Sequence, residues 1–365
     1  MAASTRVSVV PLGAQHPVLP EPVALKLSLE EEKVVDVSIT VGYCHRGIEK
    51  AAEMNDFKQN VFLCGRVCGI CSHHHTTSYS DAIETMMNIE VPERAKLIRT
   101  IVAELERLHS HTLILGLTAD AMGYENLFMQ TWRDREIVMD LFEIISGNRV
   151  HYDINQIGGV RRDIGYDVVK KIEKGMDLLE ERFNILAKSY LDDPTFKKRT
   201  KGVGVLSSAE AHTYGVVGPV ARGSDIPEDV RASGDENYAA YKDLHFTPQV
   251  EEDGDIYSRT KVRVREVFQS IDLIRQAIGY LRDGPIAARV QGNPNGEAIA
   301  RVEAPRGELF YYAKGNNTKN LERVKIRTPS FVNIPALKYM IIGEEFSAVP
   351  VIIASIDPCL SCTDR

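Results

Sequence analysis

The sequence contains no apolar run long enough to cross a bilayer. A membrane-spanning helix needs ~20 consecutive apolar residues, and the most apolar stretches, residues 336–343 and 348–356, are much shorter. The N-terminal residues also lack a basic segment followed by an apolar run, so we expect no secretory signal peptide. By default these features predict a cytosolic, reducing setting for the chain.

An excess of basic charge is also missing. The chain has 44 basic and 51 acidic residues and a formal net charge of −7, with no stripe of lysine or arginine, so we expect no nucleic-acid partner. The hydrophobic share of 44% and the charged share of 26% exclude a disordered chain and a collagen-like or coiled-coil rod. Because the 365 residues show neither a linker nor a repeat, we expect one domain, 1–365.

Two kinds of periodicity predict the fold. Within residues 7–45, Val23–Leu29 and Val34–Val41 alternate apolar and polar residues around a polar turn, which indicates a small antiparallel sheet. From residue 91 the period becomes helical, with inward-facing stripes on helices near 91–115, 127–145, 172–190 and 258–281.

We therefore expect a mainly α fold with a long-helix bundle as its core. The bundle would span about residues 91–282, after the small N-terminal antiparallel sheet and before a C-terminal part, residues 283–365. Ser207–Glu236 and Gly284–Asn317 are rich in turn-forming residues, so both stretches are predicted to be long loops.

Cysteine is absent between Cys71 and Cys359. Near each end a C-x-x-C pair, Cys68 with Cys71 and Cys359 with Cys362, places two sulfurs on one tight turn. Two such turns can supply four thiolates to a soft metal site, such as zinc, iron–sulfur or another soft-ligand metal. The pattern predicts that residues 283–365 return to meet the first pair.

Two simpler interpretations of the cysteines remain open but explain less. The pairs of a structural zinc site usually lie ~15–20 residues apart, far closer than these. The spacing Cys64-x3-Cys68-x2-Cys71 is that of a radical-SAM iron–sulfur loop. However, Ile70 stands where such loops usually carry an aromatic residue, and Cys359 and Cys362 would be unused.

Both pairs, together with their neighbours, resemble those of the large catalytic subunit of nickel–iron hydrogenases. The matching stretches are Arg66-x-Cys68-Gly-x-Cys71-x3-His75, Asp357-Pro-Cys359-x2-Cys362, Gly13–Pro17, His45–Glu49, Gly218–Ser224 and Glu303–Gly307. They look most like the membrane-bound, energy-converting branch of the Ech type or the CO-induced type. That branch also resembles the quinone-site subunit of respiratory complex I, which lacks the four cysteines. A non-catalytic quinone or electron-transfer scaffold is therefore the second hypothesis.

The resemblance implies a nickel–iron centre. Cys68 and Cys359 would be terminal nickel ligands, and Cys71 and Cys362 would bridge nickel and iron. The iron would carry carbon monoxide and two cyanides, as Fe(CO)(CN)2. The reaction would be reversible cleavage of dihydrogen, with the Cys359 sulfur as the first base.

Further residues take roles from the same resemblance. Glu21 would relay protons, and Arg306, held by Asp357, would lie above the metals. Pro329 and Ser330 would line the iron cyanides, with the hydroxyl donating to a cyanide nitrogen. His75 is expected to hydrogen-bond near the site, while His73 and His74 pack or face solvent.

Glu49 matches a glutamate that in many relatives binds a second metal, magnesium or iron. The histidine that shares this metal is replaced here by Arg365, which cannot ligate a cation. Either a Glu49–Arg365 ion pair replaces the metal, or the metal uses water and backbone oxygens, and the ion pair is slightly favoured.

The electron path implies partners. After the four ligands only Cys44 and Cys64 remain, and both are expected to be plain buried thiols. Iron–sulfur clusters would therefore lie in a small hydrogenase subunit docked to this chain. The resemblance further implies other soluble and membrane subunits, indirect exchange with ferredoxin, coupling to ion translocation, and a peripheral place on the cytoplasmic side of the membrane.

Overall fold

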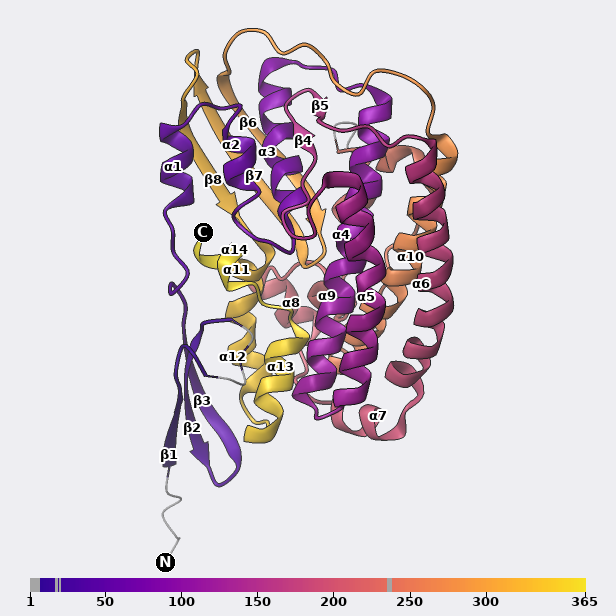
Figure 1. Cartoon of the computed structure of the whole chain (residues 1–365). Helices are drawn as coiled ribbons and strands as arrows, with labels where there is room; N and C mark the ends of the chain where they lie inside the picture. Colours follow the sequence, from indigo (N-terminus) through magenta and orange to yellow (C-terminus); the bar gives the residue numbers. More distant parts are fainter. Residues whose placement is uncertain (1–6, 17–18, 20, 235–237) are drawn as a thin grey trace, which may run out of the picture.

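Long helices packed side by side form most of the protein (Figure 1). The computed structural model describes residues 7–16, 19, 21–234 and 238–365. The long helices are α4 (Glu93–Ala121), α5 (Glu125–Ser146), α6 (Tyr166–Asp192) and α10 (Ile256–Tyr280). α4 packs against α5 and α10, and α6 contacts both of these. The predicted mainly α, long-helix fold is confirmed.

Helix α4 is the central element. It begins after Pro92, whose fixed backbone suits a helix start, and the predicted stripe from Leu97 to Leu115 is buried. The helix is buried on its other faces too, and these include the charged residues Arg99, Glu104 and Arg107. Because periodicity shows only the apolar side, the sequence did not reveal that α4 is enclosed on all sides.

The N-terminal sheet is confirmed. Strands β1 (Val7–Leu12), β2 (Ala24–Glu30) and β3 (Lys33–Thr40) pair antiparallel in the order β1-β2-β3. Leu25, Leu27 and Leu29 point inward and are buried, as the alternating pattern requires. Residue Pro17 of the predicted motif at 13–17 lies outside the described residues.

The predicted loop over Gly284–Asn317 is wrong. It contains β6 (Asn295–Ala304) and β7 (Gly307–Asn316), which form a second antiparallel sheet with β8 (Leu321–Arg327). The inward residues of β6 include Ala298 and Ala300, which are too small to mark an apolar face. Helix α3 (Ser72–Met87) packs on β6 and β7 and carries the first cysteine turn to this sheet.

The other predicted loop is also partly wrong. Within Ser207–Glu236 the chain forms α8 (Ser208–Tyr214), α9 (Pro219–Arg222) and the 3-10 turn η1 (Val230–Ala232), and residues 235–236 lie outside the described part. Helix α8 begins with a capping box in which Ser207 and Glu210 bond each other's backbone. Helices this short carry too few periods to be recognised from apolar spacing.

Short elements complete the fold and bring the C-terminus back to the centre. Near the first cysteine turn lie α1 (Ile48–Met54), α2 (Asn60–Cys64), β4 (Asn155–Gln156) and β5 (Gly159–Val160). The others are α7 (Pro194–Thr200), η2 (Tyr241–Asp243), α11 (Pro329–Asn333), η3 (Ile334–Ala336), α12 (Leu337–Ile341), η4 (Phe346–Ala348), α13 (Val349–Ser355) and α14 (Leu360–Asp364). Helix α12 packs on β3, and α14 lies beside α11, below the β6–β8 sheet in the view of Figure 1. Among the described helices, none is long and apolar enough to span a membrane.

Candidate metal centre

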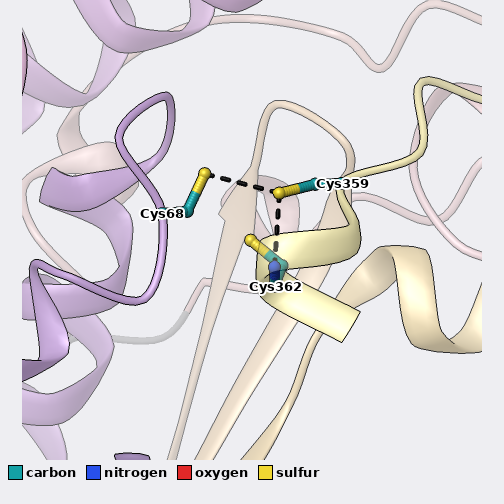
Figure 2. A group of neighbouring side chains, drawn as sticks. All are labelled: Cys68, Cys359 and Cys362. Carbon is teal, nitrogen blue, oxygen red and sulfur yellow. Dashed lines mark hydrogen bonds between the residues drawn. The ribbon is translucent and has the colours of Figure 1, made fainter. Parts of the chain in front are cut away.

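Two cysteine turns from opposite ends of the chain meet at one buried point. Cys68 lies in the loop before α3 and Cys71 at the start of that helix, while Cys359 and Cys362 lie at the start of α14. The Cys71 and Cys362 sulfurs are 3.4 Å apart, and those of Cys68 and Cys359 are 3.5 Å apart. Figure 2 shows Cys68 facing Cys359 and Cys362 across the gap between the two turns.

The four sulfurs form one continuous group. Cys68, Cys359 and Cys362 place their sulfurs within 4.8 Å of one another, and Cys362 shares a second such group with Cys71 and His75. In the described part of the chain, Cys64 belongs to neither group. A radical-SAM loop would need Cys64 beside Cys68 and Cys71, so that interpretation is wrong.

The side chain of Arg46 ties the two cysteine turns together. Its guanidinium donates to the carbonyls of Arg66 and Val67 before Cys68, at 2.8 and 2.9 Å, and to the carbonyl of Ser361, at 2.8 Å. An arginine has five N–H donors in a fixed plane, so one side chain can bridge several carbonyls. The sequence motif at 45–49 included Arg46, but its clamping role was missed.

The C-terminal turn has a second anchor in Asp364. Its carboxylate accepts hydrogen bonds from the backbone N–H groups of Gly42 and Cys44, at 2.9 and 2.7 Å. His45 Nδ1 lies 2.7 Å from the Asp364 carbonyl. These bonds hold α14 against the segment before α1. Cys44 itself is only partly buried, so the expectation of a fully buried thiol is wrong for it.

The buried thiols cannot all ionise without a cation. Hydrogen bonds from Cys359, Cys362 and Cys71 lower the pKa of Cys68 well below its usual value. Burial raises the pKa of Cys362 well above its usual value, and the sulfurs of its neighbours add to this effect. A first thiolate therefore opposes the ionisation of the others, and a bound cation would remove that opposition.

Arg306 and Asp357 form a buried ion pair beside the sulfurs. Arg306 Nη2 lies 2.8 Å from Asp357 Oδ1, and Arg306 Nε donates to the Asp357 carbonyl at 2.9 Å. Although burial opposes it, Asp357, Cys359 and Cys68 raise the pKa of Arg306 well above its usual value. Asp357 has a left-handed backbone (φ 54°), which is costly for a residue with a side chain and is common at functional sites.

Glu21 reaches the second cysteine turn. Its carboxylate accepts hydrogen bonds from the backbone N–H groups of Leu360 and Ser361, the latter at 3.0 Å. Burial and the charge of Cys68 raise the pKa of Glu21. A carboxyl with a raised pKa beside thiols holds a proton more readily than a free glutamate does.

The remaining predicted site residues surround the sulfurs. Ser330 Oγ, preceded by the buried Pro329, accepts a hydrogen bond from the Cys359 N–H at 2.9 Å, which leaves its own O–H free to donate. His75 Nε2 lies 3.4 Å from the Cys362 sulfur, and burial lowers the pKa of His75 to about 4, so its ring is neutral.

The histidines before His75 have buried partners. His73 Nε2 lies 3.0 Å from the Arg99 carbonyl, and His74 Nδ1 contacts the carboxylate of Glu106. Both side chains are fully buried, so they pack in the interior and do not face solvent.

Glu49 is held by nitrogen donors. Its carboxylate pairs with Arg365 Nε at 3.0 Å and Arg323 Nη2 at 3.2 Å, and it accepts from the Ile326 N–H at 3.0 Å. The predicted contact with Arg365 is therefore present, and Arg323 is an addition that the sequence did not indicate. In the described residues, Glu49 belongs to none of the groups that could hold a metal.

A second set of buried charges lies between α4, α9 and α10. This charged network consists of Glu104, Arg107, Arg222, Asp229, Arg231, Glu266 and Glu303, all buried. Glu104 contacts Arg107 and Arg231 at 3.3 and 3.2 Å, and it also accepts hydrogen bonds from Tyr241 and Ser270, each at 2.6 Å. Arg222 pairs with Glu266 and Glu303 at 2.8 and 2.7 Å. Each acid of the network thus has a basic partner.

The site residues fit a soft metal centre with small polar ligands. Two sulfurs on one tetrahedral metal, with bonds of ~2.3 Å, lie roughly 3.7 Å apart, close to the separations seen here. Among the described residues, the buried atoms Arg306 Nη1 and Asp357 Oδ2 have no hydrogen-bond partner. Unpartnered buried polar atoms are costly, so they indicate that something else belongs at this site.

Comparisons with known proteins agree with this geometry. The family model described as "Nickel-dependent hydrogenase" matches residues 46–119. The model described as "Respiratory-chain NADH dehydrogenase, 49 Kd subunit" matches residues 121–293 and 289–365. The first match therefore includes Cys68 and Cys71, and the second includes Cys359 and Cys362.

Individual relatives cover nearly the whole chain. The "Carbon monoxide-induced hydrogenase" of Rhodospirillum rubrum is 42% identical over 98% of this chain and 99% of its own length. The "Membrane-bound hydrogenase subunit alpha" of Pyrococcus furiosus is 41% identical over 98% of this chain and 87% of its own. A chain from the structure of the membrane-bound sulfane sulfur reductase, an archaeal respiratory membrane complex, superposes with a TM-score of 0.93 at 28% identity and covers 100% of both chains.

Proposed function

Because the chain belongs to the family of membrane-bound hydrogenase large subunits, which is related to a subunit of respiratory complex I, we propose that it is the catalytic subunit of a nickel–iron hydrogenase. The observation that carries this proposal is the convergence of four buried cysteine sulfurs from two distant turns. Its reaction is the reversible conversion of dihydrogen into protons and electrons. We further propose that the reaction is coupled to ion translocation by the complex.

The four thiolates would hold the metals, with Cys68 and Cys359 on nickel and Cys71 and Cys362 shared between nickel and iron. A nickel–iron centre carrying Fe(CO)(CN)2 would supply the redox chemistry on which dihydrogen is split. Ser330 and Pro329 would face the iron ligands, and the free O–H of Ser330 supplies a donor for them. The guanidinium of Arg306, held by Asp357, places positive charge beside the sulfurs.

Protons would move through this chain's own groups. The Cys359 sulfur accepts the first proton, and the Glu21 carboxyl receives it because Glu21 is bonded to the same turn at Leu360 and Ser361. The raised pKa of Glu21 supports this role, since it lets the carboxyl hold a transferred proton more readily than a free glutamate does.

Partners would complete the electron path. We propose an iron–sulfur small subunit, further soluble and membrane subunits, indirect exchange with ferredoxin, and a peripheral place on the cytoplasmic side. At Glu49 we propose that the ion pairs with Arg365 and Arg323 stand in place of the magnesium or iron of other family members.

A second candidate function is a non-catalytic quinone or electron-transfer scaffold. It is favoured by the match of the complex I family model to residues 121–365. A scaffold that binds no metal has no role for four converging thiols, whereas a nickel–iron hydrogenase would use all four as metal ligands. The presence or absence of nickel in the purified complex therefore separates the two functions.

Loss of one metal ligand tests the proposal. Cys68→Ser should abolish hydrogen–deuterium exchange and nickel retention, because a serine hydroxyl is a poor ligand for a soft metal. Exchange in the purified complex and its nickel content are the measurements. Cys44→Ser is the matched control, since Cys44 is outside both sulfur groups and should keep both properties. Normal exchange with full nickel in Cys68→Ser would refute the metal assignment.

A further inference from the structure

Tyr311 is a buried polar residue that the proposed reaction does not use. It lies on β7, and its side chain is 0% exposed. The Tyr311 hydroxyl lies 2.8 Å from His75 Nδ1. Because His75 Nε2 lies 3.4 Å from the Cys362 sulfur, Tyr311, His75 and Cys362 form a continuous line into the metal centre.

One arrangement of donors along this line directs an N–H group at the metal centre. A neutral imidazole has one N–H donor and one acceptor nitrogen, so a donor at one nitrogen places the proton on the other. If the Tyr311 O–H donates to Nδ1, the N–H of His75 must be at Nε2, facing the Cys362 sulfur.

We propose that Tyr311 is a positioning residue that fixes the tautomer of His75 so that Nε2–H donates to the sulfur of Cys362. This inference rests on the proposed function, in which Cys362 is shared between nickel and iron. A hydrogen bond to a thiolate withdraws electron density from the sulfur and therefore from the metals. Tyr311 thus sets the electron density of the metal pair without touching it.

Ring packing holds Tyr311 in place independently of its hydroxyl. Its ring meets His75 edge-on with centroids 5.8 Å apart, and it meets Tyr79 edge-on at 6.2 Å. Removing only the oxygen should therefore leave the ring where it is. Without a donor at Nδ1, His75 can adopt the other tautomer, in which a lone pair at Nε2 faces the sulfur and the hydrogen bond is lost.

Tyr79→Phe is the matched control. Tyr79 is equally buried in the same aromatic cluster, but its hydroxyl donates to the backbone carbonyl of Phe57 at 2.8 Å and does not reach His75. Both substitutions remove one buried phenolic oxygen, so a shared loss of packing or stability would appear in both. Only Tyr311→Phe should change the metal centre.

The test is the infrared spectrum of the purified complex in the region of metal-bound carbon monoxide. In Tyr311→Phe the band should shift to lower frequency, because a more electron-rich sulfur increases donation from iron into carbon monoxide. Tyr79→Phe should leave the band in place. Hydrogen oxidation should fall about 10-fold in Tyr311→Phe, within the range found for partners of metal ligands.

The outcomes separate this inference from the proposed function. A band that is present in the wild type but unmoved or raised in Tyr311→Phe, or shifted equally in Tyr79→Phe, would overturn the role of Tyr311 alone. Absence of the band in the wild type would overturn the proposed function first. If Tyr311→Phe does not assemble, His75→Gln decides, because it removes the imidazole that faces the Cys362 sulfur, and an unmoved band in that variant overturns the inference.

Discussion

The protein buries charge in two regions that differ in how the charge is balanced. In the charged network, each acid has a basic partner within the chain, as in the contacts of Glu104 with Arg107 and Arg231. At the metal centre, four thiols that would carry like charges converge beside the buried ion pair of Arg306 with Asp357. The acids of the network are paired with arginines of the same chain, whereas the cysteine centre needs a cation from outside. The two regions should therefore fail in different ways when a residue is removed.

Among the variants that keep their metals, the largest effect on chemistry should come from Glu21→Gln. The amide oxygen can still accept from the Leu360 and Ser361 N–H groups, so the turn and its metals should be retained, but an amide cannot relay a proton. We expect hydrogen–deuterium exchange to fall by about 10²-fold or more, with normal nickel content. Glu32→Gln, on the exposed β2–β3 turn, is the control. If Glu21→Gln exchanged at the wild-type rate, the relay would lie elsewhere.

The largest effect on stability should come from Glu104→Ala in the charged network. Removing this acid takes away the carboxylate that pairs with both Arg107 and Arg231. Breaking a buried ion pair costs about 3–5 kcal/mol of unfolding free energy. Urea denaturation of the purified chain measures the change. Glu322→Ala removes an exposed acid paired with Lys314, so it should cost below about 1 kcal/mol. Equal losses in the two variants would show that the network is not the stabilising element.

The pH dependence of the unfolding free energy tests whether ionised Glu104 stabilises the charged network. Although burial opposes it, Arg107 and Arg231 lower the pKa of Glu104 to about 2, while an unfolded glutamate has a pKa near 4.5. Its contribution to stability is therefore complete above about pH 4.5 and is lost as pH falls toward 2. The difference in unfolding free energy between wild type and Glu104→Gln should shrink over this range. A difference that stayed constant from pH 6 to about 2.5 would contradict the ionised state of Glu104.

The smallest effect should come from Arg365→Ala at the edge of the metal centre. Glu49 keeps Arg323 and the Ile326 N–H as partners, so its charge is not left alone. We expect a lower nickel content, because α14 is held less firmly, with unchanged turnover per nickel. Arg323→Ala removes the other guanidinium from Glu49 without loosening α14, so this variant should keep its nickel. Full nickel with slower turnover would instead place Arg365 in the chemistry.

The sequence predicted the parts of the fold whose burial follows a simple period. The long helices and the first sheet have regular apolar spacing, and their inward residues are buried as expected. The β6–β8 sheet was missed because Ala298 and Ala300 do not stand out as apolar. The charged network was missed because Glu104 and Arg107 look like surface residues until the partners from η1 and α10 are brought beside them. The single-domain organisation stays a prediction.

The part of the candidate site that could be predicted is the part where cysteine, by its residue type and spacing, already indicates metal binding. The two C-x-x-C pairs by themselves indicated a shared soft metal site, and the four sulfurs do meet. Arg46 and Tyr311 were not predicted, because they act on backbone carbonyls and on a histidine ring from distant segments. Their partners Ser361 and His75 become apparent only once the two ends of the chain are brought together.

The most direct test of the account is the metal content and infrared spectrum of the purified complex. If the four sulfurs hold a nickel–iron centre, each copy of this chain should carry nickel and iron, and the spectrum should show bands of metal-bound carbon monoxide and cyanide. Both signals should be lost in Cys359→Ser, while the described fold, with its charged network intact, remains. Zinc in place of nickel, or a metal-free complex without these bands, would contradict the account.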